Sequence, residues 1–375
     1  MVLVRERILG LLASIFVVVG LLVYVALGSQ SMPMTEAARG GAAVQVGVTF
    51  SPREATYRNL PWRAAFNAAL DASPALVRVG VYWNEVEATP GTYDFSTVDW
   101  LLDQASLRQQ RVLLTVGMKA PRWPEYYFPE WLASRLRVAD RGVVSHDVQV
   151  RTATRALLTA TVEHLRERPP LAAWQVENEP LDAAGPHLWR IDPDFLAEEI
   201  ALVRSLDAVA QRPIVVNTFV DTQPGALLPG TRSAIWSRAQ RALATADLLG
   251  LDVYPSRTLR VFGAELTVRW PAWIWSGLLG QLHELASSQG KDAWIVEVQA
   301  EPWTSAGGRL PPAAWPGAMV TPSSVERVVG RLEAAGYRTI LLWGVEHWEA
   351  QRSQGQDSSW WTAASAVFGR TSGVS

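Results

Sequence analysis

The chain has 375 residues, of which 49% are hydrophobic and 19% are charged, and its formal net charge is −2. This composition excludes a disordered chain, and without a long run of like charge it gives no reason to expect nucleic acid as a partner. Because the chain has no cysteine, disulfides, zinc–thiolate sites and thiol catalysis are excluded. Its five scattered histidines show no metal-ligand spacing, so no metal site is predicted.

The N-terminus carries an uncharged apolar run, Ile8 to Leu27, preceded by Arg5 and Arg7. A helix of that length spans roughly 30 Å, the thickness of a bilayer core. We therefore expect residues 1–28 to form a signal-anchor transmembrane helix, with cleavage and secretion as the alternative. The arginines place the N-terminus in the cytoplasm and the remainder outside it. Residues 29–43 are small and polar and predict a linker to a domain over residues 44–370.

From Val44 onward, eight apolar strand-like runs alternate with amphipathic helical stretches. This alternation predicts an α/β protein with a single (β/α)8 TIM barrel. A doubly wound open sheet is the other candidate, but the first strand is not followed by a glycine-rich phosphate loop. The predicted strands are Val44–Ser51, Leu76–Trp83, Arg111–Met118, Leu171–Asn178, Pro213–Phe219, Asp247–Tyr254, Ala293–Val298 and Thr339–His347. The predicted helices are Trp62–Leu70, Val98–Ser106, Val148–Arg166, Pro193–Val209, Ile235–Ala244, Ile274–Ser288 and Ser323–Gly336.

Polar residues alternate with apolar ones inside two of these strands. In the second strand Arg78 shares a face with Gly80 and Tyr82, and in the sixth Asp252 shares one with Tyr254. Polar groups that face a barrel axis are costly unless they pair with one another. The pattern therefore predicts a functional site near the carboxyl ends of the strands.

Two glutamates end predicted strands on opposite sides of the barrel. Glu179 follows the fourth strand, where capping of the next helix is the alternative role, and Glu297 ends the seventh. Glu301 also follows the seventh strand, but the unbroken apolar approach favours Glu297. Two carboxyl groups that converge over a barrel mouth are what acetal cleavage needs, since one protonates the leaving oxygen and the other attacks the sugar.

The segment Asn178-Glu179-Pro180, together with Glu297, resembles the active-site sequence of clan A glycoside hydrolases of the cellulase and β-galactosidase types. The stretch from Tyr82 to Phe95 is similar to a segment after the second strand of many such enzymes. The resemblance implies that Glu179 is the acid/base, Glu297 the nucleophile and Asn178 a ligand of the sugar 2-hydroxyl. It also implies that Arg78 and Tyr254 orient the nucleophile, and that Trp343 forms the floor of the sugar subsite.

Physical reasoning agrees that Arg78 needs a buried carboxylate, for which Glu297 and Glu177 are both available. Further predicted substrate contacts lie at or after strand ends: Trp83, Lys119, Trp123, Asn217, Trp303 and His347.

The sequence therefore predicts a membrane-anchored, extracytoplasmic retaining glycoside hydrolase with an oligo- or polysaccharide substrate and no cofactor. Two alternatives stay open. One is a catalytically silent carbohydrate-binding barrel at the cell surface, and the other is a transglycosylase that uses the same residues.

Overall fold

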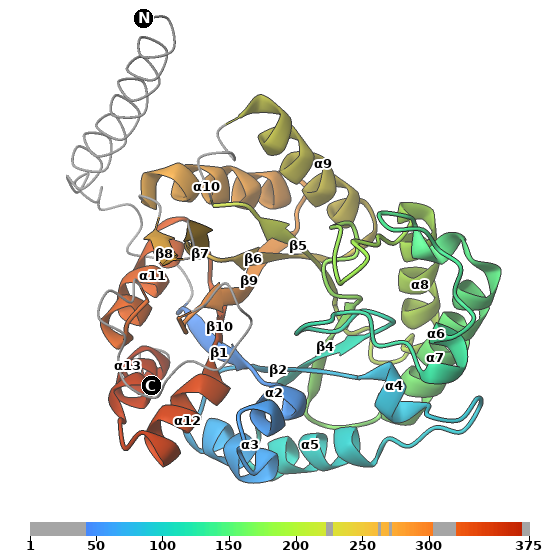
Figure 1. The fold of residues 1–375 in the computed structure, drawn as a ribbon, viewed down its shortest axis with the longest axis horizontal. Coiled ribbons are helices and arrows are strands. Elements are labelled where there is room, and N and C mark those ends of the chain that lie inside the picture. The colour runs from blue at the N-terminus through green and yellow to red at the C-terminus, as the bar shows by residue number, and fades with distance from the viewer. Residues whose placement is uncertain (1–42, 223–227, 262–263, 270–271, 303–319, 370–375) are drawn as a thin grey trace, which may run out of the picture.

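The computed structural model describes residues 43–222, 228–261, 264–269, 272–302 and 320–369. Eight parallel strands close into a barrel in the order β1-β10-β9-β6-β5-β4-β3-β2, with helices around them (Figure 1). This confirms the predicted single barrel and excludes the open sheet. The barrel strands are β1 (Gln45–Thr49), β2 (Val77–Gly80), β3 (Val112–Val116), β4 (Leu171–Val176), β5 (Ile214–Val220), β6 (Leu248–Val253), β9 (Asp292–Gln299) and β10 (Thr339–Trp343).

The longer helices lie between barrel strands and bury one face against them. Several begin at a side-chain cap; Asp147, for example, accepts hydrogen bonds from the backbone amides of Gln149 and Val150. The described helices are α2 (Pro52–Tyr57), α3 (Trp62–Asp71), α4 (Trp83–Val86), α5 (Ser96–Leu107), α6 (Glu130–Ala133), the 3₁₀ turn Val144–His146, α7 (Val148–Leu165), α8 (Pro193–Leu206), α9 (Pro229–Thr245), α10 (Ala272–Ser288), α11 (Pro322–Ala334), α12 (Val345–Gln354) and α13 (Ser359–Phe368).

Two predicted strands extend too far at their carboxyl ends. Trp83 begins α4 rather than ending β2, and His347 lies in α12 rather than in β10. In both places a helix with buried residues in its first turn follows the strand directly, so burial continues past the end of the strand. Gly344, with φ +141°, forms the turn between β10 and α12.

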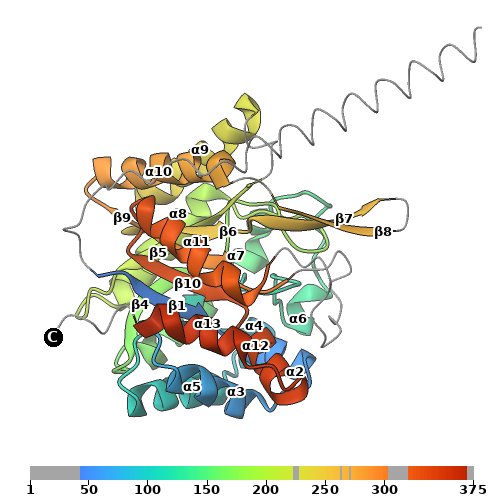
Figure 2. The same ribbon diagram turned by 90° about the vertical axis from the view of Figure 1, so that its left-hand side faces the viewer.

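An antiparallel hairpin that the sequence did not predict follows β6. Its strands are β7 (Ser256–Val261) and β8 (Ala264–Arg269). It extends beyond the barrel strands (Figure 2).

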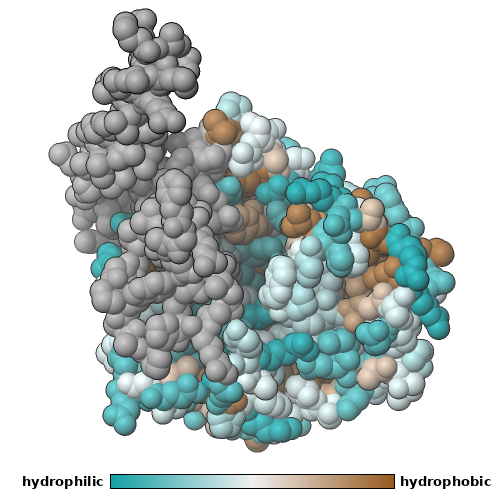
Figure 3. Space-filling view, in the orientation of Figure 1, coloured by the Kyte–Doolittle hydropathy of each residue, from teal (hydrophilic) through white to brown (hydrophobic). Residues whose placement is uncertain are grey.

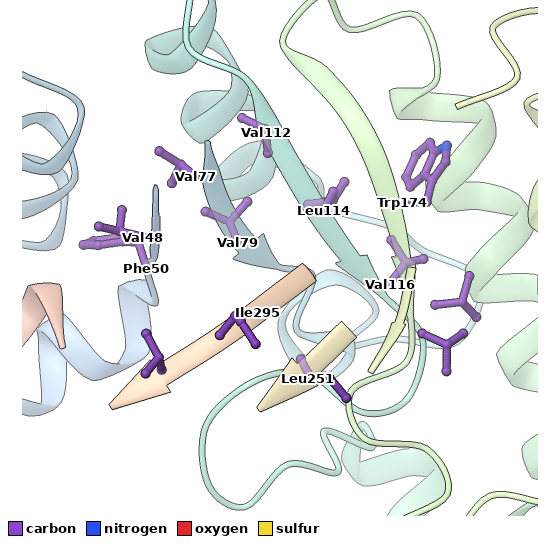
Figure 4. Close-up of a cluster of buried hydrophobic side chains, with 14 of the residues drawn as sticks. Val48, Phe50, Val77, Val79, Val112, Leu114, Val116, Trp174, Leu251 and Ile295 are labelled. Atoms are coloured by element: carbon purple, nitrogen blue, oxygen red, sulfur yellow. The ribbon is translucent and has the colours of Figure 1, made fainter. Parts of the chain in front are cut away.

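Two apolar layers form the core. The outer layer lies between strands and helices and includes Val77, Val79, Trp174 and Ile295 (Figure 4). The inner layer fills the barrel with the alternate residues Leu76, Leu113, Ala173, Val215, Trp294, Val296 and Leu341. Because Leu76 and Val77 belong to opposite layers, Arg78 faces the barrel interior, as the alternation in the sequence predicted.

None of the described helices is long and apolar enough to cross a membrane. The predicted anchor, residues 1–28, lies outside the described residues. The first described strand begins at Gln45, next to the predicted domain boundary at Val44.

Candidate active site

Glu297 faces the barrel interior because β9 contains an irregularity. Relative to β6, Ile295 pairs with Leu251 but Glu297 pairs with Asp252, so Val296 is an additional residue in β9. Val296 belongs to the inner apolar layer, and strict alternation would then turn Glu297 outward. A bulge of this kind redirects one side chain. Here it directs a carboxyl group toward the barrel axis.

Two donors hold the carboxylate of Glu297. Arg78 Nη1 donates to its Oε1 at 2.5 Å, and the hydroxyl of Tyr254 donates to its Oε2. Arg78 is fully buried, and Glu297 is 3% exposed. Burial and the charge of Glu297 raise the pKa of Tyr254 well above its usual value, so this hydroxyl keeps its proton and remains a donor. The structure thus pairs Arg78 with Glu297 and brings together the three residues expected at the nucleophile.

The same arginine links this carboxylate to the end of β4. Arg78 Nη2 donates to Asn178 Oδ1 at 2.6 Å, and Asn217 Nδ2 donates to the same oxygen at 3.0 Å. The amide nitrogen of Asn178 has no hydrogen bond to any described residue. A fixed oxygen and an open N–H₂ group suit Asn178 to donate to a sugar hydroxyl.

Asn217 connects three parts of the site. Its Oδ1 accepts from the backbone amide of Glu179 at 2.8 Å and from Gln175 Nε2 at 3.0 Å. Its Nδ2 donates to Asp252 Oδ2 at 2.6 Å as well as to Asn178. Both ends of the amide are occupied and the residue is 1% exposed, which contradicts the predicted substrate contact. Asn217 instead fixes the backbone of Glu179.

Glu179 lies at the end of β4 and is partly exposed, with a backbone φ of +44°. Although part of the residue is exposed, desolvation by the surrounding protein, and then the carboxyl groups of Asp252, Glu125, Asp182 and Glu297, raise the pKa of Glu179 well above its usual value. A carboxyl group that keeps its proton near neutral pH can act as a general acid. The surroundings of the two glutamates therefore differ, since two donors bind the carboxylate of Glu297 and several acidic groups surround Glu179.

Glu177 supports the loop after β3 and does not pair with Arg78. Its carboxylate accepts from the backbone amides of Met118 at 2.8 Å and Lys119 at 2.6 Å. A side chain at Gly117 would come within 2.2 Å of that carboxylate, so only glycine fits there. The alternative partner that the sequence offered to Arg78 is thus wrong, because backbone amides already satisfy Glu177.

Three other predicted substrate contacts are buried. Trp83 is fully buried, and its indole N–H donates to Glu87 at 2.7 Å. Lys119 is also fully buried, and its Nζ donates to the backbone oxygen of Glu179 at 2.7 Å. His347 is 3% exposed, and burial lowers its pKa to about 4. Trp83 and Lys119 are therefore closed to a ligand in this structure, whereas His347 is exposed to the same extent as Glu297, so its substrate contact stays a prediction.

Of the last two predicted substrate contacts, one is exposed and the other lies outside the described residues. Trp123, on the loop after β3, is 70% exposed and therefore accessible to a ligand. Trp303 lies outside the described residues.

A buried ionic cluster supports the predicted sugar platform, Trp343. The Arg122 guanidinium carbon lies 3.7 Å from the centre of this indole ring. Arg122 binds Glu346 at 2.5 Å and Glu301 at 3.5 Å, and Arg58 binds Glu301 at 3.0 Å. Glu301 also accepts from the Trp343 indole nitrogen at 3.1 Å. The second carboxylate after β9 is thus engaged in holding Trp343. Arg122 lies in an irregular loop without periodicity, so no sequence pattern indicated this role.

The sequence also gave no role to Asp252, although it placed this residue on the inward face of its strand. Asp252 is fully buried beside Glu297 and belongs to the same polar network.

Among the described residues, no group of three or more acidic or histidine side chains is arranged to hold a metal ion. On the side of the molecule seen in Figure 3, hydrophobic residues form several separate groups among hydrophilic ones.

Residues 56–187, just over a third of the chain, match the β-galactosidase family known as glycoside hydrolase family 42. The matched part contains Arg78, Asn178 and Glu179 but neither Tyr254 nor Glu297. No curated protein sequence matches the chain significantly.

Solved structures share the fold at low sequence identity. A β-galactosidase from the haloarchaeon Halorubrum lacusprofundi is 14% identical with a TM-score of 0.57, and the match covers 88% of this chain and 58% of that one. An exo-β-1,4-mannosidase from an Opitutaceae bacterium is 17% identical with a TM-score of 0.53, over 83% and 55%. A β-galactosidase from a psychrophilic Marinomonas is 16% identical with a TM-score of 0.51, over 80% and 53%. The chain thus spans a little over half the length of these proteins. The family match and these neighbours bear out the resemblance to clan A glycoside hydrolase barrels.

Proposed function

We propose that the protein is a retaining glycoside hydrolase in which Glu179 is the general acid/base and Glu297 the nucleophile. The observation that carries this proposal is the contrast between the two carboxyl groups. Arg78 and Tyr254 both donate to Glu297, which stabilises its ionised form. Burial and acidic neighbours stabilise the protonated form of Glu179.

In the first step, Glu297 attacks the anomeric carbon while Glu179 gives its proton to the departing glycosidic oxygen. This forms a covalent glycosyl ester and leaves Glu179 ionised. In the second step, Glu179 takes a proton from water as that water attacks the anomeric carbon, and Glu297 departs as a carboxylate. Two inversions give net retention. The open N–H₂ group of Asn178 would donate to the sugar 2-hydroxyl during both steps.

The proposed substrates are β-linked hexosides. The family match is to β-galactosidases, and the similar structures include β-galactosidases and an exo-β-1,4-mannosidase. The tryptophan Trp343, braced by Arg122, would support the sugar at the cleaved bond. Aryl β-galactosides and aryl β-mannosides are therefore the first substrates to test.

The test uses the wild-type chain with Glu179→Gln and Glu297→Gly. We expect turnover of at least one aryl glycoside and an NMR spectrum in which the first product keeps the anomeric configuration of the substrate. Azide should restore part of the activity of Glu297→Gly and form the glycosyl azide of inverted configuration. A product of inverted configuration from the wild type would refute retention. Full activity in either variant would refute the assigned role.

Two further functions use the same site. A transglycosylase would transfer the sugar to another sugar instead of water, and product analysis with added acceptor sugars separates the two. A silent carbohydrate-binding barrel would bind glycans without turnover. The paired glutamates favour an enzyme, because sugar binding alone does not need two carboxyl groups in different protonation states.

We also propose that residues 1–28 anchor the protein with its barrel outside the cytoplasm. The uncharged apolar run from Ile8 to Leu27 and the two preceding arginines support this topology. Membrane fractionation followed by N-terminal sequencing tests it. A mature protein that begins after the apolar run would show cleavage and secretion instead.

A further inference from the structure

Asp252 is an acidic residue in the barrel interior to which the mechanism above gives no role. It lies on the inward face of β6, between the neighbouring strands β5 and β9, and pairs in register with Phe219 and Glu297. It is fully buried. A buried carboxyl group is costly unless it is protonated or strongly hydrogen-bonded, so its presence needs a physical reason.

Its contacts join the proposed acid/base to the strand framework. Asp252 Oδ2 accepts from Asn217 Nδ2 at 2.6 Å, and Asn217 Oδ1 accepts from the backbone amide of Glu179 at 2.8 Å. Asp252 Oδ1 is buried and receives no hydrogen bond from a described donor, so it is open to accept one from the neighbouring carboxyl group of Glu179 when that group is protonated. One asparagine therefore holds Asp252 by its side chain and Glu179 by its backbone, which keeps the two residues side by side.

The charge around this pair is strongly acidic. Arg78 is the cation that acts on Asp252, but its Nη groups donate to Glu297 and Asn178. Burial and then the charge of Glu297 raise the pKa of Asp252 well above its usual value. The charged or titratable groups around the pair are Arg78 from β2, Lys119 and Glu125 from the loop after β3, Asp182 from the loop after β4, Glu297 from β9 and Tyr254 next to β6.

Two carboxyl groups in hydrogen-bonding contact cannot both ionise easily, and they hold one proton between them until the pH is high. We propose that Asp252 is a positioning residue that shares a proton with Glu179, so that the acid/base is held protonated and oriented before the glycosidic bond breaks. This inference rests on the proposed function.

The shared proton follows the reaction in a defined way. In the free protein Glu179 carries the proton and donates it in a hydrogen bond to Asp252. When the leaving oxygen takes that proton, Glu179 becomes a carboxylate and its hydrogen bond to Asp252 is lost. Repulsion between two neighbouring carboxylates then favours the return of a proton from the attacking water to Glu179, which regenerates the starting pair.

The test is the pH profile of kcat/KM for Asp252→Asn. The alkaline limb of this profile reports loss of the proton from the acid/base of the free enzyme. Removing the charge of Asp252 should shift the alkaline limb to lower pH by about one unit or more. The loss of activity should also depend on the leaving group. It should be large for a methyl or alkyl glycoside and small for a 2,4-dinitrophenyl glycoside, which departs without protonation.

A matched control separates this effect from general damage to the barrel. Asp207 is another buried carboxylate, which binds Arg212 at 2.7 Å and the Trp174 indole nitrogen at 2.9 Å. Arg212 precedes β5, and Trp174 lies in the outer apolar layer between β4 and the helices, away from the barrel interior. Asp207→Asn should lower the melting temperature without moving the alkaline limb. Asp252→Ser provides a second uncharged side chain if Asp252→Asn does not fold.

The outcomes distinguish the two proposals. If the wild type turns over and Glu179→Gln is inactive, but folded Asp252→Asn or Asp252→Ser keeps the wild-type alkaline limb, the proton-sharing role is wrong. An equal loss on activated and unactivated leaving groups would also overturn it. If the wild type does not turn over any glycoside, or Glu179→Gln is fully active, the proposed function itself fails.

Discussion

Replacement of Arg78 by lysine tests whether a single guanidinium organises both halves of the site. Arg78 donates through Nη1 to Glu297 at 2.5 Å, through Nη2 to Asn178 at 2.6 Å and through Nε to Thr115 at 3.3 Å. A lysine keeps the positive charge but offers one ammonium group in place of a planar fork. The three N–H donors of an ammonium share one nitrogen and do not reproduce the spread of the guanidinium, so we expect Arg78→Lys to keep Glu297, the proposed nucleophile, and to lose Asn178.

The contacts of Arg78 set the size of the expected loss. A hydrogen bond that involves a charged group contributes about 1.5–3 kcal/mol. If the Arg78→Lys variant keeps the ion pair with Glu297 and loses the bond to Asn178, kcat/KM should fall by about 10- to 150-fold. Arg78→Met should lower kcat/KM further and also destabilise the fold. It removes the cation that pairs with buried Glu297, which costs on the order of 3–5 kcal/mol of stability.

The assay measures kcat/KM on an aryl glycoside and the melting temperature of each variant. Arg212→Lys is the matched control. Arg212 also uses a guanidinium fork, to Asp207 at 2.7 Å and to the backbone oxygen of Leu171 at 2.8 Å, but at the amino-terminal end of the strands. It should lose stability and keep its kcat/KM. A folded Arg78→Lys variant with kcat/KM within about two-fold of the wild type would refute the bridging role, because the expected loss starts near ten-fold.

Three other predictions concern residues around the site. Trp83→Ala should destabilise the fold by about 3–5 kcal/mol in urea unfolding, since Trp83 is fully buried; an unchanged midpoint would contradict its place in the core. Trp123→Ala should leave the melting temperature unchanged and raise KM for oligosaccharides more than for small aryl glycosides, and equal KM values would remove its predicted substrate contact. Burial, and then the neighbouring Glu177, raise the pKa of Glu199 well above its usual value, so the unfolded chain loses this proton at lower pH than the folded one. Wild-type stability should therefore fall as pH rises above the ordinary range of glutamate, and Glu199→Gln should flatten that fall in melting curves.

The barrel could be predicted because its strands and helices have different periodicities. Each barrel strand overlaps a predicted apolar run, and the alternation around Arg78 correctly indicated which face points inward. The same signal failed where one buried element follows another directly. Trp83 and His347 are buried like the strands before them, and the predicted strands were extended into α4 and α12, in the second case past Gly344. The hairpin β7–β8 was missed although its register is regular.

The partners at the candidate site were harder to predict than its location. Strand-end glutamates and an inward arginine are visible in a sequence, but Arg78 could have paired with Glu177 or Glu297. Backbone amides of Met118 and Lys119 decide that choice, because they occupy the carboxylate of Glu177. Which amides converge on a carboxylate depends on loop geometry, and loop geometry has no periodic signal. For the same reason Arg122 was not anticipated as the brace of Trp343.

The bulge in β9 shows how the fold permits what simple alternation forbids. Trp294 and Val296 fill the inner layer, so a regular strand would direct Glu297 toward the helices. With one additional residue relative to β6, Glu297 turns inward beside Asp252, within reach of Arg78. The irregularity that brings Glu297 to its donors therefore also brings it beside an acidic neighbour. The nearby charge of Glu297 raises the free-energy cost of ionising Asp252. The hydrogen bond from Asn217 and the neighbouring Glu179 carboxyl group offset that cost. Part of the acidic surroundings of Glu179, the proposed acid/base, thus follows from the same backbone feature that orients Glu297, the proposed nucleophile.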